Sequence, residues 1–598
     1  MAEQASLLSE WRFSSKAVIL VAVLLCYFPG IRGGFLLDDH VLVEKNNFIQ
    51  ELKAPHLYFA QEDGVPDRSQ WQTDEYHTGY YRPLVSLSYA LDHWIHGNNP
   101  VGFRLTNLLL HLAVCLSLLA FLRRHVADGI FTLAAVLVFA LHPVNTEAVA
   151  WISSRNNIMA ALFSVLALDF YARRGGYSLL LSVLFFALAL FSKEYGVMLL
   201  PMLFAWNRTL GAGQRDVKQE TVSYLPFGAV LVGYFILRAS VTGSVLSPAE
   251  GAGFWLRLAM VPYLVLYNLR LILLPAGLHS FSVDYPEKGT WAPIILGLVG
   301  LALVSVLIWR YRHDKRLLMG TACFLLGLFP VLHVVPTSAV SLISMRWLYF
   351  PLAFFTIAWC RPLSFLLRKP LTAWVLVAAI LALGGYSAYL NRFQWHDDTV
   401  FFQREVVEFG NMAYAGGMAD VLHGRGQYQE AEFYYLKGIE ARPNMVETRI
   451  SYAALLTDTG RPEQALAVLD QVDGWAMSSL NRGRLCNNQG VAMMRLKKIS
   501  DAIALLEKAV ALAPDEPTCW GNLGSAYGRI GDYVRSSQAF ERGLSLAPQS
   551  VGLLSGLVLT RLNMKDFQGA AQAFERLPKA EREKRADLAE RIRSGLSK

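Results

Sequence analysis

The residues with the clearest chemical potential lie between Ile31 and Gln50, in the stretch IRGGFLLDDHVLVEKNNFIQ. Two adjacent carboxylates, Asp38 and Asp39, follow the first hydrophobic segment there. A charge at the bilayer centre costs roughly 2.5 to 3.5 kcal/mol on insertion scales, so an acidic pair should lie outside the hydrocarbon. A carboxylate can accept a proton from an attacking hydroxyl group. The stretch therefore predicts a catalytic site at a membrane surface, formed by Asp38 and Asp39.

Further polar residues are expected on the same face of the membrane. His142 and Glu147 form a second titratable pair, and the cations are Arg82, Arg155, Lys193 and Arg346. Arg and Lys neutralise charge that develops on a phosphate leaving group, so the set suits transfer from a phosphate-linked donor whose tail stays in lipid. The alternative is that these residues serve bundle packing, with Arg82 and Arg155 reaching headgroups and His142 ending a helix.

Metal-dependent hydrolysis and nucleotide hydrolysis have little support. There is no DxD at the site, no HExxH and no Walker loop, and no metal is expected. The Asp397-Asp398 pair further along the chain is interpreted as a solvated linker or helix cap rather than a chemical group. The six Cys lack the spacing of a zinc or redox motif and are expected to be packing residues.

Composition indicates a membrane protein with a second, soluble domain. Of 598 residues, 54% are hydrophobic and 17% charged, and the apolar residues are concentrated before about residue 390. The net charge of +8 comes mainly from short basic clusters beside hydrophobic segments. This pattern is typical of cytoplasmic anchoring and argues against nucleic-acid binding.

The basic clusters predict the topology. A cytoplasmic tail (1–15) is expected to precede a membrane domain (16–390) with an external loop (31–102). All the clusters lie on the cytoplasmic side only if one hydrophobic segment does not cross, and the best candidate is 257–275, which contains two Arg. About eleven spans then remain, and everything after Tyr389 is external. If 257–275 does cross, the C-terminal half becomes cytoplasmic.

The C-terminal part contains repeats. After a linker (391–411), small residues recur at spacings of 34, 37, 34 and 34 residues. They are Ala431, Ala465, Ala502, Ser536 and Ala570. The clearest copy has Trp520, Leu523, Gly524 and Tyr527 at tetratricopeptide spacing. About five such repeats are predicted over 412–580, with a longer loop near 474–479 and a charged capping helix over 581–598. The predicted fold is therefore all-α, with a polytopic helical membrane domain followed by a solenoid.

The polar motifs, read in order, resemble a known family. The series consists of Asp38-Asp39, Asn46-Asn47, Tyr81-Arg82-Pro83-Leu84, His142-Pro143 with Thr146-Glu147, Arg155, Ser192-Lys193-Glu194, Arg346-Trp347-Leu348-Tyr349 with Pro351, Asn391-Arg392 with Trp395, and the C-terminal repeats. This series resembles the transmembrane and tetratricopeptide-repeat protein O-mannosyltransferases of the GT-C glycosyltransferase superfamily. The resemblance covers nearly the whole chain.

The resemblance implies a polyprenyl-phosphate sugar donor, mannose or another hexose, and Ser or Thr hydroxyl acceptors on externalised proteins. It implies that Asp38 is the base, in preference to Asp39. Tyr81, His142, Glu147 and Glu194 would support the site, and the repeats would bind the acceptor polypeptide. Relatives are expected to have Glu before the Arg of the RxLYxP element, where this chain has Met345.

The compact size leads us to expect a bacterial inner-membrane protein with periplasmic repeats, or a lumenal repeat domain if the protein is eukaryotic. Two other classes of function stay open at this point. One is a non-enzymatic, membrane-anchored repeat scaffold, because repeats alone reveal no chemistry. The other is a ligase or transporter of lipid-linked sugars.

Overall fold

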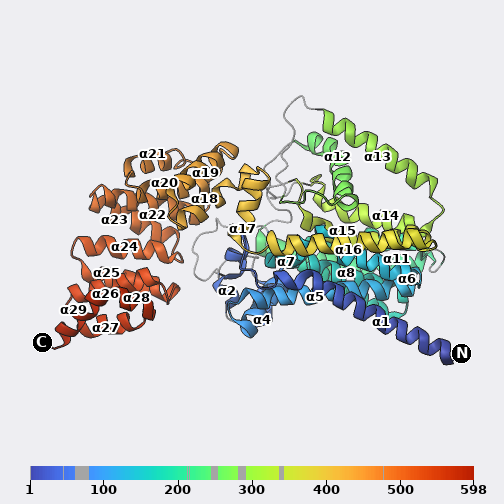
Figure 1. The fold of residues 1–598 in the computed structure, drawn as a ribbon, viewed down its shortest axis with the longest axis horizontal. Coiled ribbons are helices and arrows are strands. Elements are labelled where there is room, and N and C mark those ends of the chain that lie inside the picture. Colours follow the sequence, from blue (N-terminus) through green and yellow to red (C-terminus); the bar gives the residue numbers. More distant parts are fainter. Residues whose placement is uncertain are drawn as a thin grey trace. The chain divides into compact units, whose positions relative to one another are not determined.

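The computed structural model describes residues 2–597 except 45, 51, 61–79, 212, 214–215, 244–252, 281–290, 336–341 and 476, and it leaves the side chains of 2–13, 47 and 307 undescribed. The chain divides into two compact units, and the second consists mainly of the residues from Gly410 onward. Within the described residues, all regular secondary structure in both units is helical, which confirms the predicted all-α fold (Figure 1).

The first unit is a bundle of apolar helices with short helical pieces at one end. Its long helices are α1 (Ala2–Tyr27), α5 (Pro100–Phe121), α8 (Arg155–Arg173), α9 (Gly176–Ser192), α11 (Val217–Thr242), α12 (Phe254–Leu273), α13 (Ala292–Arg310), α15 (Tyr349–Leu366) and α16 (Pro370–Phe393). Shorter ones are α4 (Pro83–His96), α6 (Ile130–Ala140), α7 (Thr146–Ala150), α10 (Leu199–Arg208), α14 (Lys315–Leu328) and α17 (Asp398–Gln403). The small pieces α2 (Asn47–Gln50) and α3 (Pro55–Phe59) follow the acidic stretch.

Among the described residues, fewer than eleven helices are long and apolar enough to span a membrane. Within the described residues, six helices are long and apolar enough to cross a membrane, or seven if α6 and the bent segment 143–150 form one broken span. A span needs about 20 residues at 1.5 Å per residue, and α9, α10 and α14 are shorter than this. Short and broken helices account for part of the difference from the expected eleven, because hydropathy alone does not separate them from full spans.

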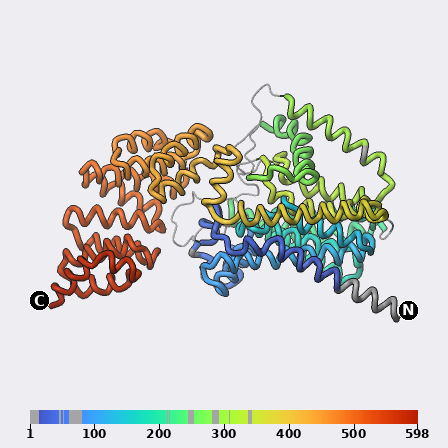
Figure 2. Tube along the Cα trace, in the orientation of Figure 1, coloured from blue at the N-terminus to red at the C-terminus, as the bar shows by residue number. Residues whose placement is uncertain are grey.

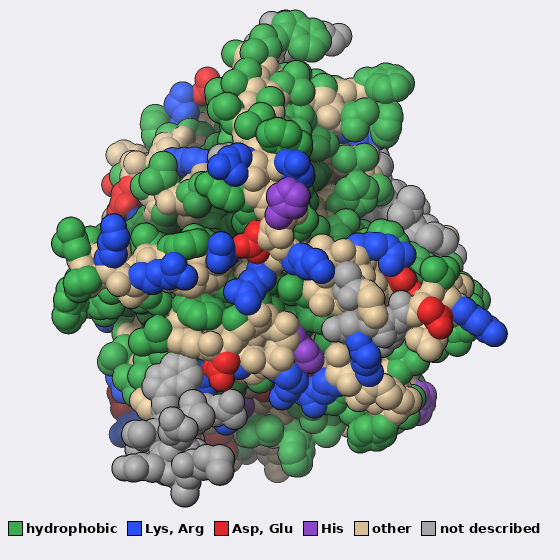
Figure 3. Space-filling model, turned by 90° about the vertical axis from the view of Figure 1, so that its right-hand side faces the viewer, with side chains coloured by type: hydrophobic (Ala, Val, Ile, Leu, Met, Phe, Trp, Pro, Cys, Tyr) green, Lys and Arg blue, Asp and Glu red, His purple; other side chains and the backbone are tan. Residues whose placement is uncertain are grey.

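Basic residues gather at one end of this unit. Helices α5, α8, α10 and α13 all end in or just before Arg residues, and Figure 3 shows Lys and Arg side chains in a band across that end. Asp169 binds Arg124 and Arg173 there, and Asp314 binds Arg361. Positive charge on one end of a helical bundle is the pattern that marks a cytoplasmic side.

Helix α12 contains the segment that is expected not to cross. It is one helix of 20 residues with Pro262 inside, and its length and composition would allow a span. In Figure 1 it lies across the direction of α16 rather than alongside it. Its Ile272 carbonyl accepts a hydrogen bond from His142 Nε2 at 2.9 Å, so its C-terminal end lies beside the break between α6 and α7. That arrangement is consistent with an interfacial helix, which stays a prediction.

The second unit is a stack of paired helices (Figure 2). The pairs are α18 (Ala415–Gly424) with α19 (Tyr428–Ala441), α20 (Val446–Asp458) with α21 (Pro462–Asp470), α22 (Ser479–Arg495) with α23 (Ile499–Leu512), α24 (Pro517–Arg529) with α25 (Tyr533–Leu546), and α26 (Val551–Asn563) with α27 (Phe567–Glu575). The recurring small residues are fully buried where the helices of each pair approach. The pieces α28 (Lys579–Lys584) and α29 (Ala586–Leu596) follow, and α29 covers the last pair with Leu588 and Ile592.

The interval between α21 and α22 is longer than the other intervals between pairs, as the spacing of 37 residues predicts. All six Cys are buried and free, which confirms the interpretation that they are packing residues. The repeat core is continuous from Ala419 to Ala539, so neighbouring pairs stabilise one another.

Candidate active site

The loop that carries the acidic pair is organised around the Asp39 carboxylate. This side chain is completely buried. Its Oδ1 accepts a hydrogen bond from the Ser153 backbone N at 2.8 Å, and its Oδ2 accepts one from the Leu36 backbone N at 3.1 Å. Burial is the main cause that raises the pKa of Asp39 to about 7, against hydrogen bonds from Ser153 that lower it. Asp39 thus holds the loop against the segment that follows α7.

Asp38 is placed in the opposite way. Its side chain is exposed, and no hydrogen bond to its carboxylate is found among the described residues. A base must reach the proton it removes, so position decides before pKa does. A pKa near 7 would suit a base, but the hydroxyl group of a substrate cannot reach the buried Asp39. The Asp38 side chain is accessible to such a group. The geometry favours Asp38 as the reactive carboxylate, and that choice stays a prediction.

Arg104 binds both the loop that carries the acidic pair and the segment that follows α16. It is buried, and its guanidinium donates to the carbonyl oxygens of Gly30, Gly34, Trp395 and His396, at distances between 2.7 and 3.4 Å. A Cβ added at Gly33 would lie 2.5 Å from the His396 carbonyl oxygen, so the two segments approach too closely for any other residue. The first loop and the segment after α16 therefore form one rigid layer.

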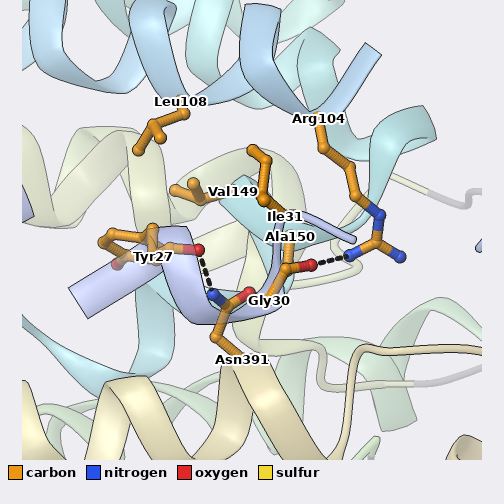
Figure 4. A pocket seen from close by; sticks show the side chains of 8 residues that line it. All are labelled: Tyr27, Gly30, Ile31, Arg104, Leu108, Val149, Ala150 and Asn391. Atoms are coloured by element: carbon orange, nitrogen blue, oxygen red, sulfur yellow. Dashed lines mark hydrogen bonds between the residues drawn. The ribbon is translucent and has the colours of Figure 1, made fainter. Parts of the chain in front are cut away.

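A small cavity lies within this layer (Figure 4). It is lined by Tyr27, Gly30, Ile31, Arg104, Leu108, Val149, Ala150 and Asn391, and its volume is about 10 Å³. The Asn391 amide donates to the Tyr27 carbonyl at 2.6 Å, which closes one side of it. This volume is about that of one water molecule, so the cavity is a packing feature and not a substrate pocket.

Truncating the two acids should separate structure from chemistry. Asp39→Ala leaves the buried N–H groups of Leu36 and Ser153 without acceptors, which costs about 1 to 3 kcal/mol for each group. We expect it to lower the unfolding midpoint of the detergent-purified protein and to speed hydrogen exchange in residues 34–44. Asp38→Ala should leave both measurements unchanged. Equal stability of the two variants would contradict the structural role of Asp39.

Two of the expected cations lie beside Glu194. Arg82 donates from Nη2 to Glu194 Oε1 at 2.9 Å and from Nε to Oε2 at 3.3 Å. Lys193 is buried, and its ammonium donates to Asn157 Oδ1 at 2.7 Å. Burial and the nearby charge of Arg82 hold the pKa of Lys193 well below its usual range. Burial raises the pKa of Glu194, but Arg82 and Lys193 outweigh this and hold it at about 2. A negative ligand would raise the pKa of Lys193 again.

Arg346 lies on another element, and its charge acts on Lys193. It lies in η9 (Met345–Leu348), and its guanidinium sits 4.3 Å from the centre of the Trp151 ring. Its backbone N and Nη1 donate to the buried Glu147 at 3.1 and 3.3 Å. Met345, which stands where an acid is expected, is fully buried, so α7 supplies the carboxylate that the adjacent position lacks.

Trp151 connects Arg346 to the acidic loop. Its indole Nε1 donates to the Leu36 carbonyl at 3.0 Å, while its ring lies under Arg346 and stacks with Trp395 at 6.0 Å. An aromatic face attracts a guanidinium and also limits its movement. One indole thus contacts a partly exposed cation and the loop that carries the accessible acid.

The other expected site residues are engaged in packing. Arg155 is completely buried and donates to Asn107, Ser88, Asp92 and Phe103. His142 accepts from the Val144 backbone N through Nδ1 and donates from Nε2 to Ile272. The Tyr81 hydroxyl donates to the Phe59 carbonyl at 2.8 Å. These three residues shape the scaffold around the site, and none presents a free polar group to it in this structure.

Loss of Arg155 should therefore act on stability. Arg155→Ala leaves the buried Asp92 carboxylate without its cation, and breaking a buried ion pair costs about 3 to 5 kcal/mol. We expect a lower yield of folded protein and a lower unfolding midpoint. The double variant Arg155→Met with Asp92→Leu should recover most of that stability. A stable Arg155→Ala protein with weakened donor binding would instead show that Arg155 contacts the donor.

The structure also reveals site residues that sequence reasoning missed, namely Arg104, Trp151, His40 and Asp398. Asp398 binds the first loop and is not a solvated linker residue. Its signal in the sequence was only a second acidic pair after the last apolar helix. In the described part of the chain, no group of three or more His, Cys, Asp or Glu is arranged to hold a metal ion.

These features define a membrane-integral helical protein with a polar site at one end and a tetratricopeptide unit. Two family profiles, both described as tetratricopeptide repeat, match residues 422–479 and 517–550. A thermophilic tetratricopeptide protein from Thermus thermophilus has a crystal structure that covers 31% of this chain and all of that chain, with 16% identity and a TM-score of 0.28.

Curated relatives carry the comparison into the membrane unit. Protein O-mannosyl-transferase TMTC3 of Mus musculus is 21% identical over 631 residues, which cover 94% of this chain and 66% of that protein. Protein O-mannosyl-transferase TMTC2 of Homo sapiens is 35% identical over 151 residues, which cover 25% of this chain and 17% of that protein. The match thus spans about two thirds or less of these relatives' own length. These matches confirm the predicted resemblance to the transmembrane and tetratricopeptide-repeat O-mannosyltransferases.

Proposed function

We propose that this protein is an inverting glycosyltransferase that moves mannose or another hexose from a polyprenyl-phosphate donor to Ser or Thr hydroxyl groups of externalised proteins. The observation that carries the proposal is that Trp151 contacts both the cation Arg346 and, through the Leu36 carbonyl, the loop that presents the accessible carboxylate Asp38. The relatives' names, protein O-mannosyl-transferase, support the acceptor and the sugar class.

Each step follows from the charges present. The Asp38 carboxylate accepts the proton of the acceptor hydroxyl as its oxygen attacks the anomeric carbon of the sugar. The bond to the lipid phosphate breaks on the opposite face, and the phosphate leaves with the electron pair. Arg346 neutralises the charge on that phosphate, aided by Arg82 and Lys193. Glu147 and Glu194 hold the two guanidinium groups in place.

The remaining expectations belong to this proposal. Asp39 supports the loop, and Arg155, His142 and Tyr81 support the helices around it. The tetratricopeptide unit binds the acceptor polypeptide, and the reaction uses no metal. The site and the repeats lie on the external side, which is the periplasm if the protein is bacterial.

The direct test uses the full chain in lipid nanodiscs. Purified protein is incubated with polyprenyl-phosphate mannose or glucose and a mixture of external proteins as acceptors. We expect release of the lipid phosphate together with a hexose-sized mass gain on Ser or Thr. Donor turnover without polypeptide modification would favour a lipid-linked sugar ligase. Absence of any turnover, with function restored by the repeat unit on an unrelated membrane anchor, would favour a scaffold.

A further inference from the structure

The first loop is held by a carboxylate that lies more than 350 residues away in sequence. Asp398, at the start of α17, accepts a hydrogen bond from the Leu37 backbone N through Oδ1 at 2.9 Å. Its Oδ2 lies 2.8 Å from His40 Nε2. One carboxylate therefore binds the loop on both sides of Asp38 and Asp39.

The residue held by Asp398 has an unusual backbone. Leu37 has φ of +50°, in the left-handed region that non-glycine residues rarely occupy. Such a conformation costs about 1 to 3 kcal/mol and persists only where its surroundings enforce it. The Asp398 bond to the Leu37 N–H is one such constraint, and the left-handed turn that it holds comes directly before the two acids.

His40 contributes a fixed positive charge beside the same turn. Its Nδ1 lies 2.5 Å from Glu44 Oε2, so its ring is held between two carboxylates. The bond to Asp398, and after it the bond to Glu44, raises the pKa of His40 to about 10. Both ring nitrogens then donate, and the imidazolium stays in place through the neutral range.

We infer that Asp398 is a positioning residue for the transfer reaction: it fixes the Leu37–His40 turn so that the Asp38 carboxylate faces the acceptor. The inference rests on the proposed function. Asp398 touches neither the acceptor nor the donor in this scheme, and it acts only through Leu37 and His40. A displacement of about 1 Å at the reacting atom can cost about 100-fold in rate, so a shifted turn should impair the chemical step more than donor binding.

Asp398→Asn tests the bridge with little change of shape. The oxygen of the introduced amide can still accept the hydrogen bond from the Leu37 backbone N. The NH₂ group of that amide takes the place of Oδ2 and cannot accept a hydrogen bond from His40 Nε2. We expect kcat to fall at least about tenfold, while the KM for the donor stays within about twofold of the wild-type value. The reason is that the substitution changes the alignment of the Asp38 carboxylate, which matters in the transition state and not in donor binding. Combining it with His40→Gln should add less than about a twofold further loss, because both variants break the same contact.

Asp397→Asn is the matched control. Asp397 neighbours Asp398, and its Oδ1 caps α17 by accepting from Val400 N at 3.0 Å, which Asn also does well. The kcat of the Asp397→Asn variant should stay within about twofold of the wild-type value. Full kcat in Asp398→Asn, or an effect that multiplies with that of His40→Gln, would overturn the inference. If Asp398→Asn does not fold, His40→Gln alone tests the same bridge.

Hydrogen exchange gives a readout that needs no activity. Asp398→Ala removes the acceptor of the Leu37 N–H, so the Leu37 amide should exchange at least about tenfold faster in this variant than in the wild type, and Asp397→Asn should not change it. Unchanged exchange at Leu37 would also overturn the inference. If the wild type transfers no sugar, the proposed function fails, while the exchange experiment still reports whether Asp398 holds the turn.

Discussion

Asp38→Asn is expected to lower kcat for sugar transfer by about 100- to 10,000-fold, the usual contribution of a general base. The amide has the same shape but cannot take the hydroxyl proton. Because Asp38 is exposed, and no described residue hydrogen-bonds to its carboxylate, the variant should insert and unfold like the wild type. The measurement is single-turnover transfer from polyprenyl-phosphate sugar to an acceptor peptide, with unfolding followed in parallel.

Glu408→Gln is a suitable control for that variant. Glu408 lies after α17, its side chain is 56% exposed, and it pairs with Arg404 at 3.4 Å. Its transfer rate should stay within about twofold of the wild type. Transfer by Asp38→Asn at more than about a tenth of the wild-type rate would remove Asp38 from the role of base.

Arg346→Ala is expected to have the second largest effect, a fall in kcat/KM of about 10- to 100-fold. Hydrogen bonds to charged groups contribute about 1.5 to 3 kcal/mol each, and in the proposed mechanism this cation binds the leaving phosphate. Arg346→Lys should recover only part of the loss, because an ammonium group neither stacks on Trp151 as a plane nor binds phosphate through two parallel bonds. Initial rates over a range of donor concentrations give the comparison.

Arg392→Ala controls for the loss of any positive charge near that end of the unit. Arg392 is exposed at the end of α16 and makes one long bond of 3.4 Å to the Pro29 carbonyl. Its kcat/KM should change by less than about twofold. Equal losses from Arg346→Ala and Arg392→Ala would mean that the cations act through general surface charge, and the specific contact to the leaving phosphate would be wrong.

Local patterns in the sequence predicted the architecture. Apolar segments and their basic flanks predicted a helical membrane unit, and small residues at a 34-residue period predicted the solenoid. Both patterns depend on neighbours within one or two helices, so they can be read without knowing the fold. The number of full spans stays a prediction, because short and broken helices, such as α6 with α7, are as apolar as complete ones.

The tertiary structure decided which polar residues are free to act. Asp38 and Asp39 are neighbours in sequence, but only Asp39 meets the Ser153 backbone N–H, 114 residues further on, and becomes buried. The sequence predicts Arg155 as one of the phosphate-binding cations, and in the structure it binds Asp92 within the bundle. Burial and hydrogen-bond partners set the reactivity of these charges, and those partners come from distant segments. The sequence alone therefore determined which residues to consider, and long-range packing determined the part each one takes.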